Sequence, residues 1–142
     1  MYRGGVELTS TDKRFGGLSG LIGSRERHEV LAVSDRGWCV SGQLRHDTKG
    51  NLVALEKANI YRMQASPAND DSRTFSLDAE ALVRSGENSF VVAFEQQHRL
   101  WEYPGLFSPP NPIDMPEKIT DLPRNSGIES LVRLQNGKLL AI

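Results

Sequence analysis

The sequence contains a single cysteine, no long apolar run and few aromatic residues, which make up 7% of the chain. Because Cys39 has no second cysteine to pair with, an internal disulfide is excluded. Its neighbours Trp38 and Val40 predict a buried small hydrophobe rather than a reactive thiol. Trp38, Trp101 and Tyr103 alternate with polar residues, which predicts packing within a sheet rather than a ligand platform. No apolar segment approaches the ~18 residues that cross a bilayer, so we expect no membrane span.

An excess of charge of one sign is also absent, since 17 basic and 18 acidic residues leave a formal charge of −1. A chain without a basic field has no means of holding a phosphate backbone, so we expect no nucleic-acid partner. His28, His46 and His98 share no metal-ligand spacing, which argues against a zinc site. Ser19 does not lie in a Gly-x-Ser-x-Gly nucleophile motif, and no phosphate-binding loop follows the paired glycines.

The sequence does contain a series of short apolar runs separated by Gly, Asn, Asp and Pro. Several alternate with polar residues, as in residues 38–44, a pattern typical of β-strands. No helical period extends over about eleven residues. The best helix candidate, residues 77–84, is predicted to be a strand by the repeat described below. The runs are residues 6–8, 18–22, 30–33, 38–44, 52–55, 60–63, 79–83, 90–94, 100–103, 128–134 and 139–142.

Turn-forming residues separate these runs. Residues 47–51 and 135–138 predict hairpin loops, and the Asn136-Gly137 pair favours a type I′ turn in the second loop. Two longer stretches, residues 65–74 and 104–123, are polar or rich in proline. Because proline cannot donate a hydrogen bond to a neighbouring strand, we expect residues 104–123 to lie outside the sheets.

An internal repeat decides the fold class. Residues 17–35, 78–95 and 127–142 align as three copies of one hairpin, in which a leucine precedes a small alanine by 11, 11 and 10 residues. The copies recur after 61 and 49 residues. Such periods are typical of β-propellers, in which each blade holds four strands in roughly 40–50 residues. We expect each hairpin to form the two inner strands of a blade, where small Ala and Gly residues fit near the axis.

The repeat therefore predicts an all-β chain, a β-propeller fragment of about two and a half blades of four-stranded antiparallel sheets. Residues 1–142 would form a single partial propeller domain. Two blades and a hairpin leave open sheet edges. Either the native protein continues beyond a truncated C-terminus, which is the simpler interpretation, or copies form a homo-oligomer through those edges.

Five motifs occur in order along nearly the whole chain: FGGLSGL at 15–21, AVSDRG at 32–37, DAEAL at 78–82, FEQQHR at 94–99 and GIESL at 127–131. As a set they resemble the phytase-like esterase family, described by "esterase-like activity of phytase". The resemblance implies a propeller in an exported bacterial protein, hence a periplasmic or secreted location. This chain shows neither a signal peptide nor the family's C-terminal half. A small-molecule ester or phosphoester is the implied substrate.

Equivalent positions of a repeat converge on the axis of a propeller. Ser19, Glu80 and Glu129 occupy the same position of the first strand, and carboxylates that share a narrow channel repel unless a proton or cation lies between them. Oxygen ligands from different blades suit Ca²⁺. Asp35 and Glu95, which follow the second strand, would complete a calcium site with Glu80 and Glu129. Alternatively, the two glutamates are structural acids that bind backbone amides or an arginine.

Two arginines and a histidine lie near these acids in the repeat. Arg36 and Arg99 are candidates for binding a substrate phosphate or carboxylate, with Ser19 as a further substrate contact. Alternatively, the arginines bridge the acids of adjacent blades. His98 is the candidate general base, unless it is simply a polar surface residue.

The residues thus leave two functions open. The first is metal-assisted hydrolysis of phosphoesters or esters, with Glu80, Glu129 and His98 as the candidate catalytic residues. The second is a non-catalytic propeller that binds a ligand or another protein, because no complete set of catalytic groups is visible.

Overall fold

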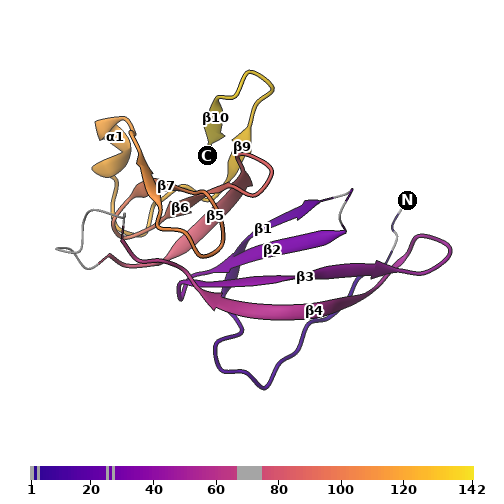
Figure 1. Cartoon of the computed structure of the whole chain (residues 1–142). Helices are drawn as coiled ribbons and strands as arrows, with labels where there is room; N and C mark the ends of the chain where they lie inside the picture. Colours follow the sequence, from indigo (N-terminus) through magenta and orange to yellow (C-terminus); the bar gives the residue numbers. More distant parts are fainter. Residues whose placement is uncertain (1, 3, 25, 27, 67–74) are drawn as a thin grey trace.

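The computed structural model describes residues 2, 4–24, 26, 28–66 and 75–142. Within them the chain forms two four-stranded antiparallel sheets and a two-stranded hairpin (Figure 1). In both sheets the strands are hydrogen-bonded in chain order, so each sheet is a meander. The predicted all-β, propeller-like fragment with four-stranded sheets is therefore confirmed.

The first sheet consists of β1 (Leu18–Ser24), β2 (Glu29–Ser34), β3 (Trp38–His46) and β4 (Leu52–Arg62). The second sheet consists of β5 (Ala79–Arg84), β6 (Phe90–Phe94), β7 (Arg99–Tyr103) and β8 (Asn111–Ile113). A single helical turn, α1 (Glu117–Thr120), precedes the hairpin of β9 (Leu131–Arg133) and β10 (Leu139–Ala141). None of the described residues forms a helix that is long and apolar enough to cross a membrane.

The three hairpin copies predicted from the repeat each begin one structural unit, namely the first sheet, the second sheet and the hairpin of β9 and β10. The first strands of these three units lie next to one another, with β1 packed against β5 and β5 against β9. Their close approach requires a glycine at position 20. A Cβ atom on Gly20 would lie 2.8 Å from the Cβ of Leu82 and 3.0 Å from Cγ2 of Val33. No side chain fits at that distance without movement of the neighbouring strand. The expectation that small residues occupy the crowded inner strands holds at this position.

The main core lies between the two four-stranded sheets. Trp101 and Tyr103 are buried in it, and the Tyr103 hydroxyl donates a hydrogen bond to the carbonyl of Gln64 at 2.9 Å. Cys39 is 1% exposed, and burial raises the pKa of its thiol to about 12, as expected for a small buried hydrophobe. A second, smaller core joins the second sheet to the hairpin through Ala81, Val91, Leu100, Ile128 and Leu131.

Several expected boundaries differ from those observed. The runs at 52–55 and 60–63 form one continuous strand, β4, whereas residues 6–8 form no strand. The stretch 104–123, expected outside the sheets, contributes β8, which pairs with β7 as the outermost strand. Pro112 is tolerated there because β8 is an edge strand. The backbone nitrogen of an edge residue can point to solvent, where a missing N–H costs no hydrogen bond to a neighbouring strand. Residues 67–74 of the polar stretch lie outside the described residues.

The turn between β9 and β10 also differs from the expectation. A type I′ turn needs positive φ at both central residues, but of Asn136 and Gly137 only the glycine has one, at 83°. The Gly137 N–H donates to the carbonyl of Leu134 at 2.9 Å, and the Leu134 N–H donates to the carbonyl of Lys138 at 2.8 Å. The loop is therefore one residue longer than expected, with the glycine in the left-handed region at its end.

Candidate functional site

The same backbone irregularity occurs at the start of all three units. The pairing of β1 with β2 shifts between Leu18 and Gly20, and that of β5 with β6 shifts between Ala79 and Ala81. Ser19 and Glu80 are therefore the extra residues of two β-bulges. In the third unit the N–H groups of residues 129 and 130 both donate to the carbonyl of Ile142, at 2.9 and 3.0 Å. A bulge redirects its side chain out of the regular pleat, which gives the shared position a structural cause.

In the second unit, the bulge brings three carboxylates together. Asp78 precedes β5, Glu80 is the bulged residue, and Glu95 follows β6. One oxygen atom of each lies within 4.8 Å of the others, and all three residues are half-buried. The Glu95 N–H donates to the carbonyl of Asp78 at 2.8 Å, which holds the two strand ends beside each other. The result is an oxygen-only cluster at the end of the inner strands.

Electrostatic repulsion within this cluster is considerable. Burial is the largest of the effects that together raise the pKa of Glu80 to about 7, and the negative charges of Asp78, Glu95 and Glu129 contribute the rest with a hydrogen bond to Asp78. Glu129 belongs to the next unit, so the acids predicted at equivalent positions of successive units do act on one another. Near neutral pH the cluster therefore holds a proton part of the time, and a cation placed among the oxygens would replace it.

Among its described residues, the first unit has no such cluster. Its acid, Asp35, is exposed and lies 3.8 Å from the Nε of Arg36, measured from Oδ1. The Ser19 hydroxyl is exposed and donates to the carbonyl of Gly17 at 3.3 Å. Gly17, at φ 61°, touches the Asp35 carboxylate so closely that a Cβ would lie 1.9 Å from Oδ1. Of the four predicted metal ligands, Glu80 and Glu95 belong to the three-carboxylate cluster of the described residues, whereas Asp35 and Glu129 do not.

His98 lies beside the cluster in a defined orientation. Its Nε2 is 3.1 Å from the carbonyl oxygen of Leu122 and 3.0 Å from that of Pro123, so the proton of the neutral ring belongs on Nε2. Nδ1 is buried and has no hydrogen-bond partner among the described residues. A Cβ on Gly127 would lie 3.3 Å from this Nδ1 and 3.2 Å from Cγ of Glu95. One glycine therefore separates an unprotonated imidazole nitrogen from a carboxylate of the cluster.

The two candidate arginines have different environments. The Arg99 guanidinium lies 4.0 Å from the ring centre of Phe94 and 4.2 Å from that of Trp101. It donates to the carbonyls of Gln97, at 2.8 Å, and Ser76. Burial lowers its pKa to about 10. These contacts give Arg99 a structural position between aromatic rings, whereas the Arg36 side chain is 59% exposed and is accessible to a ligand.

Asp78 is the member of the cluster that the sequence analysis did not assign as a ligand. The equivalent positions of the other two units are Gly17 and Gly127. The available signal was an acid at a position that is glycine in the other two copies, two residues before the bulged Glu80 and opposite Glu95. Its Oδ2 also accepts a hydrogen bond from Nε2 of Gln96 at 2.5 Å, which orients the carboxylate.

Comparison with known proteins gives two matches. Residues 13–142 match the family model "Phytase-like: Esterase-like activity of phytase". A 75-residue segment is 37% identical to dihydro-heme d1 dehydrogenase of Pseudomonas aeruginosa, covering 52% of this chain and 15% of that protein. No solved structure shows significant similarity. The family match includes the repeat, the bulges and the acidic cluster. Because it covers most of the chain, the chain belongs to the phytase-like family described by the esterase-like activity of phytase.

Proposed function

We propose that this chain forms part of a hydrolase of phosphoesters or esters, in which Asp78, Glu80 and Glu95 hold a divalent cation. The observation that carries the proposal is the convergence of these three carboxylates, with oxygens within 4.8 Å of one another. Acids held this close repel each other unless a cation or a proton is shared among them. Burial raises the pKa of Glu80, and repulsion from Asp78, Glu95 and Glu129 adds to the shift, so a proton or a cation is favoured here.

The donor atoms favour calcium. Hard cations prefer carboxylate oxygens, and Ca²⁺ binds them at about 2.3–2.6 Å, so two of its ligands can be as much as about 5 Å apart. The cluster meets this limit without rearrangement. Ca²⁺ takes about six to eight oxygens. Glu129, whose charge reaches Glu80, is a candidate for a further ligand, and water or substrate oxygens would complete the shell.

A cation held by Asp78, Glu80 and Glu95 would supply Lewis-acid chemistry: it would polarise a phosphoryl or carbonyl oxygen and favour ionisation of a nearby water. In this proposal His98 would accept the proton of an attacking water. The hydrogen bonds of its Nε2 to two carbonyls and the unpaired Nδ1 among the described residues support that role. Arg36 follows β2 as Gln96 follows β6, so it lies at the same end of the strands and can bind the substrate anion. Arg99 has no part in this step.

The printed name of the Pseudomonas aeruginosa relative describes a dehydrogenase of dihydro-heme d1, and this chain spans 15% of that protein's length. One fold supports many chemistries, so the proposal depends on the carboxylates and on the family rather than on that relative. A periplasmic or secreted location, which the family resemblance implies, is part of the proposal.

The test is hydrolysis of para-nitrophenyl phosphate and para-nitrophenyl acetate by the protein that contains this chain, with and without calcium. We expect calcium-dependent turnover that falls about a hundredfold or more in Glu80→Gln. The matched control is Glu102→Gln, because Glu102 lies on β7 outside the cluster. Equal turnover in both variants would overturn the assignment. Calcium binding without hydrolysis of either ester would favour the non-catalytic scaffold.

A further inference from the structure

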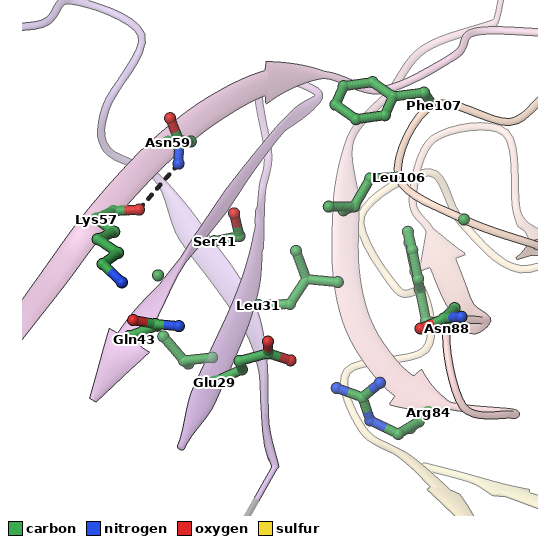
Figure 2. Close-up of a pocket in the computed structure, with 14 residues that line it drawn as sticks. Glu29, Leu31, Ser41, Gln43, Lys57, Asn59, Arg84, Asn88, Leu106 and Phe107 are labelled. Carbon is green, nitrogen blue, oxygen red and sulfur yellow. Dashed lines mark hydrogen bonds between the residues drawn. The ribbon is translucent and has the colours of Figure 1, made fainter. Parts of the chain in front are cut away.

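A cavity separate from the acidic cluster lies between the two four-stranded sheets, with a volume of about 500 Å³ (Figure 2). That volume is within the range of ligand pockets, which is about 300–1,000 Å³. The cavity is at the opposite end of the strands from the acidic cluster. Asp78 and Glu80 are at the start of β5, whereas Arg84, which lines the cavity, ends that strand. The two sites are therefore separate and can be tested independently.

The first sheet supplies a polar floor. Leu31 pairs with Ser41, and Ser41 with Asn59, so these three form one row across β2, β3 and β4. Glu29 pairs with Gln43 in the adjacent row. Side chains directly opposite one another on paired strands project from the same face. The floor thus presents a hydroxyl, two amides and a carboxylate beside one leucine.

Lys57 reaches the same floor from an irregular backbone. The pairing of β3 with β4 shifts between Ser41 and Gln43, and at this bulge Lys57 has a positive φ of 51°. The amide of Asn59 donates to the Lys57 carbonyl at 2.9 Å, which stabilises the bulge. A left-handed lysine is strained, and such strain concentrates at binding sites. Figure 2 shows the ammonium group extending along the floor beside Gln43.

The second sheet supplies the opposite wall, which is mainly apolar. Leu106 and Phe107 come from the loop between β7 and β8, and Phe90 from the start of β6. Phe107 is 68% exposed and contacts Tyr61 edge to face, with ring centres 4.9 Å apart. Its ring is therefore held in place while much of it remains open to solvent. Arg84 closes this wall and donates to the Glu87 carbonyl at 2.9 Å.

The unused polar groups define the chemistry of the ligand. Glu29, Ser41, Gln43 and Lys57 make no hydrogen bond or ion pair through their side chains with any other described residue. Both donors and acceptors are thus available. Figure 2 shows the Glu29 carboxylate between Lys57 and Arg84, so a purely anionic ligand would meet repulsion at the floor. An apolar ligand would displace water from the polar floor and offer no hydrogen bonds in place of those that the water made.

From these features we propose that this cavity, the inter-sheet groove, binds a neutral oligosaccharide. Vicinal hydroxyls both donate and accept, as the amides and the carboxylate of the floor require. The C–H face of a sugar ring is apolar and flat enough to rest against the exposed ring of Phe107. The groove then holds a saccharide at one end of the strands while the acidic cluster lies at the other. This site goes beyond the proposed hydrolase and does not depend on it.

The test is a titration followed by amide chemical shifts in nitrogen-15-labelled protein, with cellotriose, xylotriose and chitotriose as probes at millimolar concentrations. At least one trisaccharide should give saturable shifts at Ser41, Gln43 and Asn59. Gln43→Ala and Phe107→Ala should each weaken that binding about tenfold or more, because each removes one side of the recognition. Gln135→Ala, in the turn between β9 and β10, is the matched control and should bind normally.

Circular dichroism of each variant tests whether it is folded. We expect both variants to fold normally, because the side chains of Gln43 and Phe107 are exposed. Absence of saturable shifts with all three sugars would overturn the proposal. Binding that survives in both variants would overturn the assignment to this groove. Binding of benzoate in place of the sugars would identify an anion site and equally contradict it. None of these results depends on calcium or on hydrolysis.

Discussion

Replacing Glu80 with glutamine removes one negative charge from a half-buried group of acids. The pKa of Glu80 is raised from 4.5 to about 7 by burial, and by the charges of Asp78, Glu95 and Glu129. Folding therefore favours the protonated acid. The wild-type stability from this group is fully present below the ordinary glutamate pKa and is lost as the pH rises to about 7. Glutamine stays neutral, so Glu80→Gln should be stabilising at pH 8 and nearly neutral at pH 5.

The size of the effect follows from the same shift. A rise in pKa from 4.5 to about 7 corresponds to at most about 3.5 kcal/mol, at about 1.4 kcal/mol for each pKa unit. Glu80 retains contact with water, and screening by solvent and salt reduces the interaction. We expect the change in unfolding free energy caused by Glu80→Gln to be about 1 kcal/mol more favourable at pH 8 than at pH 5.

The assay is urea denaturation without calcium, followed by tryptophan fluorescence at both pH values. Trp101 lies in the core between the sheets, so its fluorescence changes when that core unfolds. Glu102→Gln, on β7, is the control and should show no such difference between the two pH values. If Glu80→Gln has the same effect at pH 5 and pH 8, or destabilises the protein more at pH 8, the electrostatic account of the cluster is wrong.

Three further predictions concern the fold. Gly20→Ala should lower the unfolding free energy by about 1–3 kcal/mol, since its Cβ would overlap Leu82; urea denaturation measures this. Arg99→Ala should cost about 2 kcal/mol in the same assay, because the guanidinium contacts Phe94 and Trp101, yet leave calcium affinity unchanged. Cys39 should resist iodoacetamide in the folded protein and react in urea, which mass spectrometry detects; reaction at equal rates would contradict its burial.

The repeat made much of the fold predictable because the spacing within a hairpin is a local property of the sequence. It placed the hairpins of all three units, and it put Ser19, Glu80 and Glu129 at one equivalent position. It did not foresee the bulge that produces this position. The strand β8 was missed because Pro112 argues against a strand. Proline is acceptable in β8 because this strand pairs with β7 on one side and is the edge of the sheet on the other.

The candidate site was predictable only in part, because its details depend on contacts between distant segments. Nothing local to Arg99 indicates that its guanidinium lies among aromatic rings. The orientation of His98 depends on the carbonyls of Leu122 and Pro123, which return to it from a proline-rich loop. The inter-sheet groove arises from the packing of two sheets, so no single motif could indicate it.

The most direct test of the central claim is a calcium titration of this chain by isothermal calorimetry near pH 7.5, comparing wild type with Glu80→Gln and Glu102→Gln. We expect one saturable site in the wild type and in Glu102→Gln, and an affinity at least about tenfold weaker in Glu80→Gln, which loses one carboxylate ligand. The absence of saturable calcium binding in the wild type, or equal affinity in all three proteins, would contradict the claim.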